Sequence, residues 1–213
     1  KWFCVFSRTD KMSDLKQAIQ REYLKCASDP VHFMRKYCTI QHPTKGKVKF
    51  DLYPFQEKCL TDFKDNRYNI ILKARQLGIS TLSAGYSLWL MLFHNDKNIL
   101  VIATGKETAK NLVTKVRVMY EGLPQWLKTG TEEINKLSLR FKNGSQIKAI
   151  ASNESAGRSE ALSLLIIDEA AFIDRIDTIW TAAQQTLATG GGCIALSTPN
   201  GVGNWFHKQW VGA

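Results

Sequence analysis

The sequence lacks long apolar runs, paired cysteines, internal repeats and low-complexity linkers. No stretch reaches the ~20 apolar residues that span a bilayer, and the opening KWFCVFS is too short for the apolar part of a signal peptide. The five cysteines include no C-x-x-C pair, so neither a zinc site nor a disulfide framework is expected. These absences favour a soluble, intracellular chain without a membrane partner. A hydrophobic content of 44% and a charged content of 23% exclude collagen-like and wholly disordered proteins.

Acidic residues are also scarce, since 19 Asp and Glu face 29 Lys and Arg and leave a net charge of +10. Such an excess indicates either a polyanionic partner or a basic surface that serves only solubility. A length of 213 residues allows one large domain or a core with a small appendage. We expect an N-terminal helical subdomain or lid over residues 1–50 and a core over residues 51–213.

Apolar periodicity predicts alternating strands and helices. Strand, helix and strand follow one another from residue 69 to residue 102, which predicts a parallel sheet with crossover helices. Alternating residues on both sides of Asn143-Gly144 predict a hairpin. The remaining expectations are helices at 13–26, 31–37, 55–63, 83–93, 107–120 and 179–187, an extended segment at 47–53, and buried strands at 69–72, 99–102, 162–167 and 193–196. This alternation is typical of an α/β nucleotide-binding core.

A polar loop follows the first buried strand and opens a helix, where backbone amides and the helix N-terminus would face an anion. Its residues are Lys73, Ala74, Arg75, Gln76, Leu77, Gly78, Ile79, Ser80 and Thr81. The match to G-x-x-x-x-G-K-[ST] is incomplete because Lys73 occupies the first glycine position and Ile79 replaces the lysine. The segment therefore predicts either a phosphate loop or a turn that binds nothing. As a phosphate loop it would offer Ser80 to Mg²⁺ and Lys73 or Arg75 to the phosphates.

Two carboxylates, Asp168 and Glu169, directly follow the four apolar residues of the third strand. Open parallel sheets bind ligands at this edge. We expect Asp168 to hold Mg²⁺ together with Ser80, and Glu169 to activate the water that attacks a γ-phosphate. The alternative is a pair of solvated acids that caps the next helix. Convergence with the phosphate loop, which we expect on an adjacent parallel strand, favours the catalytic interpretation.

Two weaker motifs agree with this interpretation. The segment from Tyr53 to Gln56 would offer a glutamine amide to the edge of adenine, or is only a helix start. After the fourth strand, Ser197, Thr198, Pro199, Asn200 and Gly201 would bring hydroxyl and amide groups beside the acidic pair, or form a plain turn.

With these motifs in this order, the sequence resembles the ATPase domain of the large terminase subunit, the DNA-packaging motor of tailed bacteriophages, most closely that of T4-type myoviruses. The resemblance runs from about Gln56 to Gly201. It implies an α/β P-loop NTPase fold of the additional-strand, RecA-like class, with a central mostly parallel sheet flanked by helices. It also implies hydrolysis of ATP with Mg²⁺, Glu169 as the catalytic carboxylate, and residues 197–200 as the link between hydrolysis and DNA movement.

The resemblance assigns arginine-finger roles to Arg158, toward the ATP of a neighbouring subunit, and to Arg75. Either guanidinium would neutralise the transferring phosphoryl group, in its own or in a neighbouring subunit, or would form only a salt bridge. It implies double-stranded DNA, the portal protein and the small terminase subunit as partners, and a homo-oligomeric ring, or a monomer in isolation. The implied location is the bacterial host cytoplasm, with transient residence at the procapsid portal.

Two departures from the family pattern stand out. T4-type loops carry lysine where this chain has Ile79, and we transfer that role to Lys73. The RNase H-like nuclease domain that large terminases carry is not expected within these residues. The alternatives are a fragment of a superfamily 2 helicase-like ATPase and a nucleotide-gated DNA-binding module without turnover.

Overall fold

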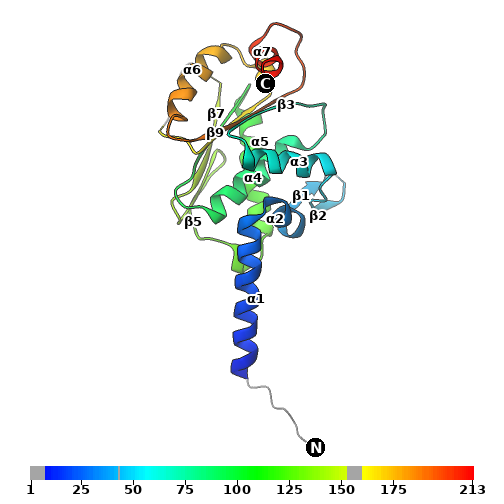
Figure 1. Cartoon of the computed structure of the whole chain (residues 1–213), viewed down its shortest axis with the longest axis vertical. Helices are drawn as coiled ribbons and strands as arrows, with labels where there is room; N and C mark the ends of the chain where they lie inside the picture. The colour runs from blue at the N-terminus through cyan, green and yellow to red at the C-terminus, as the bar shows by residue number, and fades with distance from the viewer. Residues whose placement is uncertain (1–7, 43, 153–159) are drawn as a thin grey trace, which may run out of the picture.

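A computed structural model describes residues 8–42, 44–152 and 160–213. A seven-stranded sheet runs through the molecule with helices on both faces (Figure 1). Among the described residues, no helix combines the length and the apolarity needed to cross a membrane. The prediction of an α/β fold with a mostly parallel sheet is confirmed.

The strand order in the large sheet is β3-β9-β8-β4-β7-β6-β5. The first five are parallel neighbours: β3 (Tyr68–Leu72), β9 (Gly192–Ser197), β8 (Leu164–Asp168), β4 (Asn98–Ala103) and β7 (Gln146–Ala151). The prediction that the phosphate-loop strand lies next to the strand of the acidic pair is wrong, because β9 lies between them. The strand that ends at Ser197 therefore separates the two motifs.

The predicted hairpin at Asn143-Gly144 is confirmed. Strands β6 (Ser138–Phe141) and β7 pair antiparallel, and Gly144 takes a left-handed φ of 80° that suits glycine in a tight turn. The side chain of Asn143 accepts a hydrogen bond from the amide of Ser145 at 3.1 Å. Strand β5 (Thr131–Ile134) extends the sheet beyond β6 and was not predicted.

Apolar residues form a core on each face of the sheet. Helices α2 (Pro30–Tyr37), α3 (Pro54–Asp65), α4 (Ile79–Phe93) and α5 (Lys106–Gly122) contribute to one core, and α6 (Ile176–Thr186) and α7 (Trp205–Val211) contribute to the other. Strand β8 is buried along its whole length, as expected for a central parallel strand covered on both faces. Its five residues read LLIID, so the chain offers a carboxylate only where the strand ends.

The N-terminal segment consists of α1 (Arg8–Ser28), α2 and a small hairpin of β1 (Thr39–His42) and β2 (Gly46–Lys49). The side chain of Asp29 caps α2 by accepting hydrogen bonds from the amides of Val31 and His32. Cys26, Phe33, Met34, Cys38 and Phe50 belong to the same core cluster as the sheet. The second half of this segment is therefore packed directly onto the α/β core, while α1 extends away from it in Figure 1.

Candidate active site

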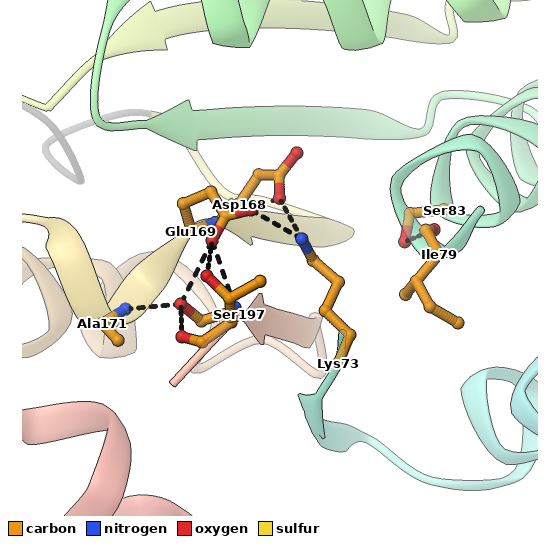
Figure 2. A network of polar contacts seen from close by, with 8 residues as sticks. Lys73, Ile79, Ser83, Asp168, Glu169, Ala171 and Ser197 are labelled. Atoms are coloured by element: carbon orange, nitrogen blue, oxygen red, sulfur yellow. Dashed lines mark hydrogen bonds and ion pairs between the residues drawn. The ribbon is translucent and has the colours of Figure 1, made fainter. Parts of the chain in front are cut away.

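Three parallel strands bring the predicted motifs together at their carboxyl ends. Lys73 follows β3, Asp168 ends β8 and Ser197 ends the intervening strand β9. The backbone amide of Lys73 donates to the carbonyl of Ser197 at 2.9 Å, which fixes the start of the phosphate loop against β9. Figure 2 shows the side chains of Lys73, Asp168, Glu169 and Ser197 gathered at this edge.

Lys73 is the cation of this cluster. Its Nζ lies 2.6 Å from Oε1 of Glu169 and 4.0 Å from Oδ1 of Asp168. The Lys73 side chain is 9% exposed, that of Asp168 8% and that of Glu169 28%, so the pair with Glu169 is only partly screened by water. The loop cation is thus bound to the carboxylate that would activate water.

Glu169 receives hydrogen bonds on both carboxylate oxygens. Besides Lys73 on Oε1, the amide and the hydroxyl of Thr198 each donate to Oε2 at 3.1 Å, and the Ser197 hydroxyl lies 3.4 Å from it. Glu169 has a left-handed φ of 55°, a conformation that is uncommon for a residue with a Cβ and is often found at functional sites. Burial works against the charged form, but the hydrogen bonds from Lys73 and Thr198 outweigh it and lower the pKa of Glu169.

Asp168 is suited to a divalent cation. Burial raises its pKa, while the charge of Lys73 and a hydrogen bond from the Ser80 hydroxyl act in the opposite direction. The contact between Ser80 and Asp168 joins the two residues that the sequence predicted as Mg²⁺ ligands. A hydroxyl and a carboxylate oxygen are the kind of hard donors that Mg²⁺ takes, so this pair fits the ion.

The phosphate loop has a turn geometry suited to anion binding. Gln76 and Gly78 both have left-handed backbone conformations, with φ of 63° and 72°, and α4 begins directly after Gly78. Such turns point backbone N–H groups toward a common concavity. Ile79, at the position of the usual lysine, is 2% exposed and packs into the core, while Arg75 is exposed.

Gln56 is attached to the phosphate loop. Its Nε2 donates to the carbonyl of Leu77 at 2.9 Å and its Oε1 accepts from the amide of Tyr53 at 3.0 Å. The positive φ of Gly78 favours glycine, and a Cβ there would lie 2.8 Å from Gln56 Nε2 and would displace this amide. The adenine contact of Gln56 stays a prediction. The exposed rings of Tyr53 and Phe55 stack beside it, with centroids 5.8 Å apart.

The predicted coupling residues are bonded to the turn that follows Glu169. The Ser197 hydroxyl accepts from the amide of Ala171 at 3.1 Å, and Nδ2 of Asn200 donates to the carbonyl of the same residue at 2.9 Å. With the contacts of Thr198, these bonds hold the ends of β8 and β9 together. Hydrogen bonds therefore connect residues 197–200 to Glu169 and to the turn that follows it.

The sequence interpretation missed two features of this region. Lys115 lies on α5, and the charges of both Asp168 and Lys73 influence its pKa. Nothing in its local sequence distinguishes it from the other lysines of that helix. Phe55, beside Gln56, was passed over as part of a helix start. Arg158, predicted as an arginine finger, lies outside the described residues.

The parallel sheet, the glycine loop at the start of α4 and the acidic pair at the end of β8 define a P-loop nucleotide-binding protein. A family model described as "Terminase large subunit, T4likevirus-type, N-terminal" matches residues 70–213, which is more than half of the chain. The chain belongs to this family of large terminase subunits.

Solved structures of terminases share the fold. The large terminase ATPase domain of Thermus phage P74-26 is 23% identical with a TM-score of 0.59, and the match covers 75% of this chain and 69% of that one. The large terminase of bacteriophage HK97 is 19% identical with a TM-score of 0.63, covering 81% and 37%. Another large terminase from a thermophilic bacteriophage, solved in complex with ADP, is 16% identical with a TM-score of 0.61, covering 76% and 42%. The chain spans only about two fifths of the length of these last two proteins.

Proposed function

We propose that this chain is the ATP-hydrolysing motor domain of a large terminase subunit, which uses ATP and Mg²⁺ to move double-stranded DNA into a procapsid. The observation that carries the proposal is the convergence of Lys73, Asp168 and Glu169 at one edge of the sheet. The thermophilic phage terminase solved with ADP supports a nucleotide as the ligand of the corresponding fold. The family match favours this function over that of a helicase fragment.

In this mechanism the phosphate loop binds the triphosphate through its backbone amides and Lys73. Ser80 and Asp168 would hold Mg²⁺, which neutralises phosphate charge when bound. Transfer of Lys73 from Glu169 to the phosphates removes the cation from Oε1 and leaves that oxygen available to accept a proton from the attacking water. The contacts of Thr198 to Oε2 keep the carboxylate oriented during this step.

The contact of Glu169 with Thr198 would connect ATP hydrolysis to the movement of DNA. A change in the position of Glu169 alters the hydrogen bonds to residues 197–200, the segment that would couple hydrolysis to DNA. Arg75 and Arg158 would act as arginine fingers for a neighbouring subunit of a ring. The portal protein and the small terminase subunit would be the partners of that ring, in the host cytoplasm and at the procapsid portal.

One observation favours a second function, that of a nucleotide-gated module without turnover. Ile79 replaces the loop lysine, and the remaining cation, Lys73, is bound to Glu169 at 2.6 Å. If nucleotide does not displace Lys73, the carboxylate stays neutralised and no hydrolysis follows. Both functions require nucleotide binding and differ only in whether phosphate is released.

The test is phosphate release from Mg²⁺-ATP by the wild-type chain and by Glu169→Gln, at protein concentrations that allow ring assembly. We expect release by the wild type, a fall of about 10²–10⁴-fold in kcat in the variant, and unchanged ATP affinity, because the amide still accepts from Thr198 but is no base. The matched control is Glu160→Gln, which alters an exposed glutamate. Binding without release by the wild type would support the second function.

A further inference from the structure

Lys115 is a cation that the proposed mechanism does not use. It lies in the third turn of α5 and lines a cavity of about 230 Å³ together with Thr81 of α4 and residues 39–41 of β1. Thr81 directly follows Ser80 in the first turn of α4, so one wall of this cavity is the phosphate-loop helix. Helix α5 therefore brings a lysine beside the first turn of the phosphate-loop helix.

No described residue pairs with the ammonium of Lys115. Within residues 8–42, 44–152 and 160–213, Lys115 makes no hydrogen bond or ion pair, although the residue is partly buried. Burial lowers the pKa of Lys115, the positive charge of Lys73 adds to this shift, and the negative charge of Asp168 opposes it. Burying an unpaired charge is unfavourable, so the fold tolerates a cost that an anion in the cavity would offset.

The balance of charges in the candidate site indicates that the anion is a nucleotide phosphate. Asp168 and Glu169 carry two negative charges, and Lys73 alone offsets only one of them. Mg²⁺-ATP is itself an anion, so it would meet a site of its own sign. Lys115 brings the four side chains to neutrality, and the loop itself offers no lysine at position 79.

We propose that Lys115 is a second phosphate-binding cation of the nucleotide site, supplied by α5 in place of the lysine that Ile79 replaces in the loop. The inference rests on the proposed function in that it takes the ligand to be a nucleoside triphosphate. Two lysines on separate elements, one after β3 and one on α5, then contact the phosphates. Nucleotide binding would draw α5 toward α4.

The test compares Lys115→Met, which keeps the length of the side chain and removes its charge, with Lys115→Arg, which keeps the charge. Both are made in the Glu169→Gln background so that ATP is not consumed, and binding of ATP is measured by calorimetry. Because a charge-assisted hydrogen bond contributes ~1.5–3 kcal/mol, we expect Kd to rise about 10–100-fold for Lys115→Met. Lys115→Arg restores most of the affinity. The matched control is Lys110→Met, whose ammonium pairs with Glu107 at 2.9 Å on the same helix.

Measurements with Mg²⁺ and with EDTA distinguish contact from an indirect effect. If Lys115 contacts phosphate, Lys115→Met weakens ATP binding both with Mg²⁺ and with EDTA. If Lys115 acts only through Asp168, the substitution weakens ATP binding only when the metal is present. Equal Kd values for Lys115→Met and its parent would overturn the proposal. Failure of the parent and of the wild type to bind ATP at all would overturn the proposed function instead.

A structure of the wild-type chain with Mg²⁺ and a slowly hydrolysed ATP analogue decides the matter if Lys115→Met does not fold. We expect Nζ of Lys115 within about 3.2 Å of a phosphate oxygen. An ammonium that remains in the cavity without a phosphate contact contradicts the proposal.

Discussion

Glu169 joins the two halves of the candidate site because each of its carboxylate oxygens faces a different element. Oε1 is bound by Lys73 from the phosphate loop, and Oε2 by Thr198 from the end of β9. Its left-handed backbone turns the side chain back over β9 immediately after β8 ends. A single carboxylate therefore connects the phosphate loop to the end of β9, which is the connection that the proposed mechanism uses.

The ion pair of Lys73 and Glu169 should stabilise the nucleotide-free protein. Lys73→Met leaves two adjacent carboxylates without their nearest cation, so we expect lower stability in urea unfolding. Glu169→Gln in the same chain removes one of those charges and should restore part of the loss. The resulting coupling energy should be about 0.5–3 kcal/mol, the range for residues in direct contact.

The coupling energy is obtained by comparing the unfolding free energies of the two single variants with that of the double variant. All of these proteins must unfold with the same m-value. Strictly additive effects would mean that the two side chains do not interact in solution. Mg²⁺-ATP should reduce the coupling, because the proposed mechanism moves Lys73 onto phosphate. A coupling that ATP leaves unchanged would argue for the module without turnover.

The sequence identified most of this site because its groups occupy fixed places relative to strands. Lys73, Ser80, Asp168 and Glu169 each follow or precede a recognisable strand or helix boundary. Lys115 could not be identified in this way, since its relation to Asp168 depends on how α5 packs against α4. The bond from Gln56 to Leu77 was equally hidden, because it depends on the distance between two loops.

At the scale of helices, Glu22 attaches α1 to α2. Its Oε1 lies 2.8 Å from His32, 2.9 Å from Lys36 and 2.9 Å from the hydroxyl of Tyr37. The ligand atoms of Glu22, Cys26 and His32 lie within 4.8 Å of one another, as in a metal site. The Lys36 ammonium already supplies the cation there, so we interpret the group as a contact between helices.

This contact makes part of the stability depend on pH. The hydrogen bonds from Lys36 and His32 lower the pKa of Glu22 from 4.5 to about 2, although burial opposes the shift. Because the pKa is lower in the folded state, the contribution is complete above pH 4.5 and is lost as the pH falls toward 2. We expect Glu22→Gln to be less stable than the wild type at about pH 6, with the difference shrinking toward about pH 2.

Unfolding free energies of both proteins between about pH 6 and about pH 2 test this expectation. Glu121→Gln is the matched control, because among the described residues the Glu121 carboxylate has only a long contact, at 3.9 Å, to Arg117 on the same helix. A stability difference for Glu22→Gln that is the same at every pH would mean that the carboxylate acts through packing rather than charge.

The predictable elements were those with strong periodicity or turn signals. Buried strands, long helices and the Asn143-Gly144 hairpin all formed as expected. Strands β1 and β5 and helix α7 were missed, since they are short and depend on partners far along the chain for their stability. The position of β9 between β3 and β8 was also missed, because strand order depends on where the crossover connections return.

At the scale of the molecule, the positive charge has to be divided between the site and the surface. Lys73 lies in the candidate nucleotide site, Lys115 is proposed as its second cation, and Lys36 and Arg35 pair with Glu22 and Glu57. The chain as a whole still carries a net charge of +10, because basic residues outnumber acidic ones. This excess of positive charge can bind a polyanion. A DNA-translocating motor needs a surface that holds phosphates without reading bases.

We therefore predict binding to double-stranded DNA of any sequence that weakens steeply with salt. Each phosphate contact should add about 0.9 to the slope of log affinity against log salt concentration, because it releases a condensed counterion. Fluorescence anisotropy with a labelled duplex over a range of salt concentrations measures this slope. Lys73→Met is the matched control, and we expect it to leave the slope unchanged because its ammonium lies in the site and contacts no DNA phosphate. A flat dependence in the wild type would assign the basic surface to solubility and leave the proposed DNA partner without support.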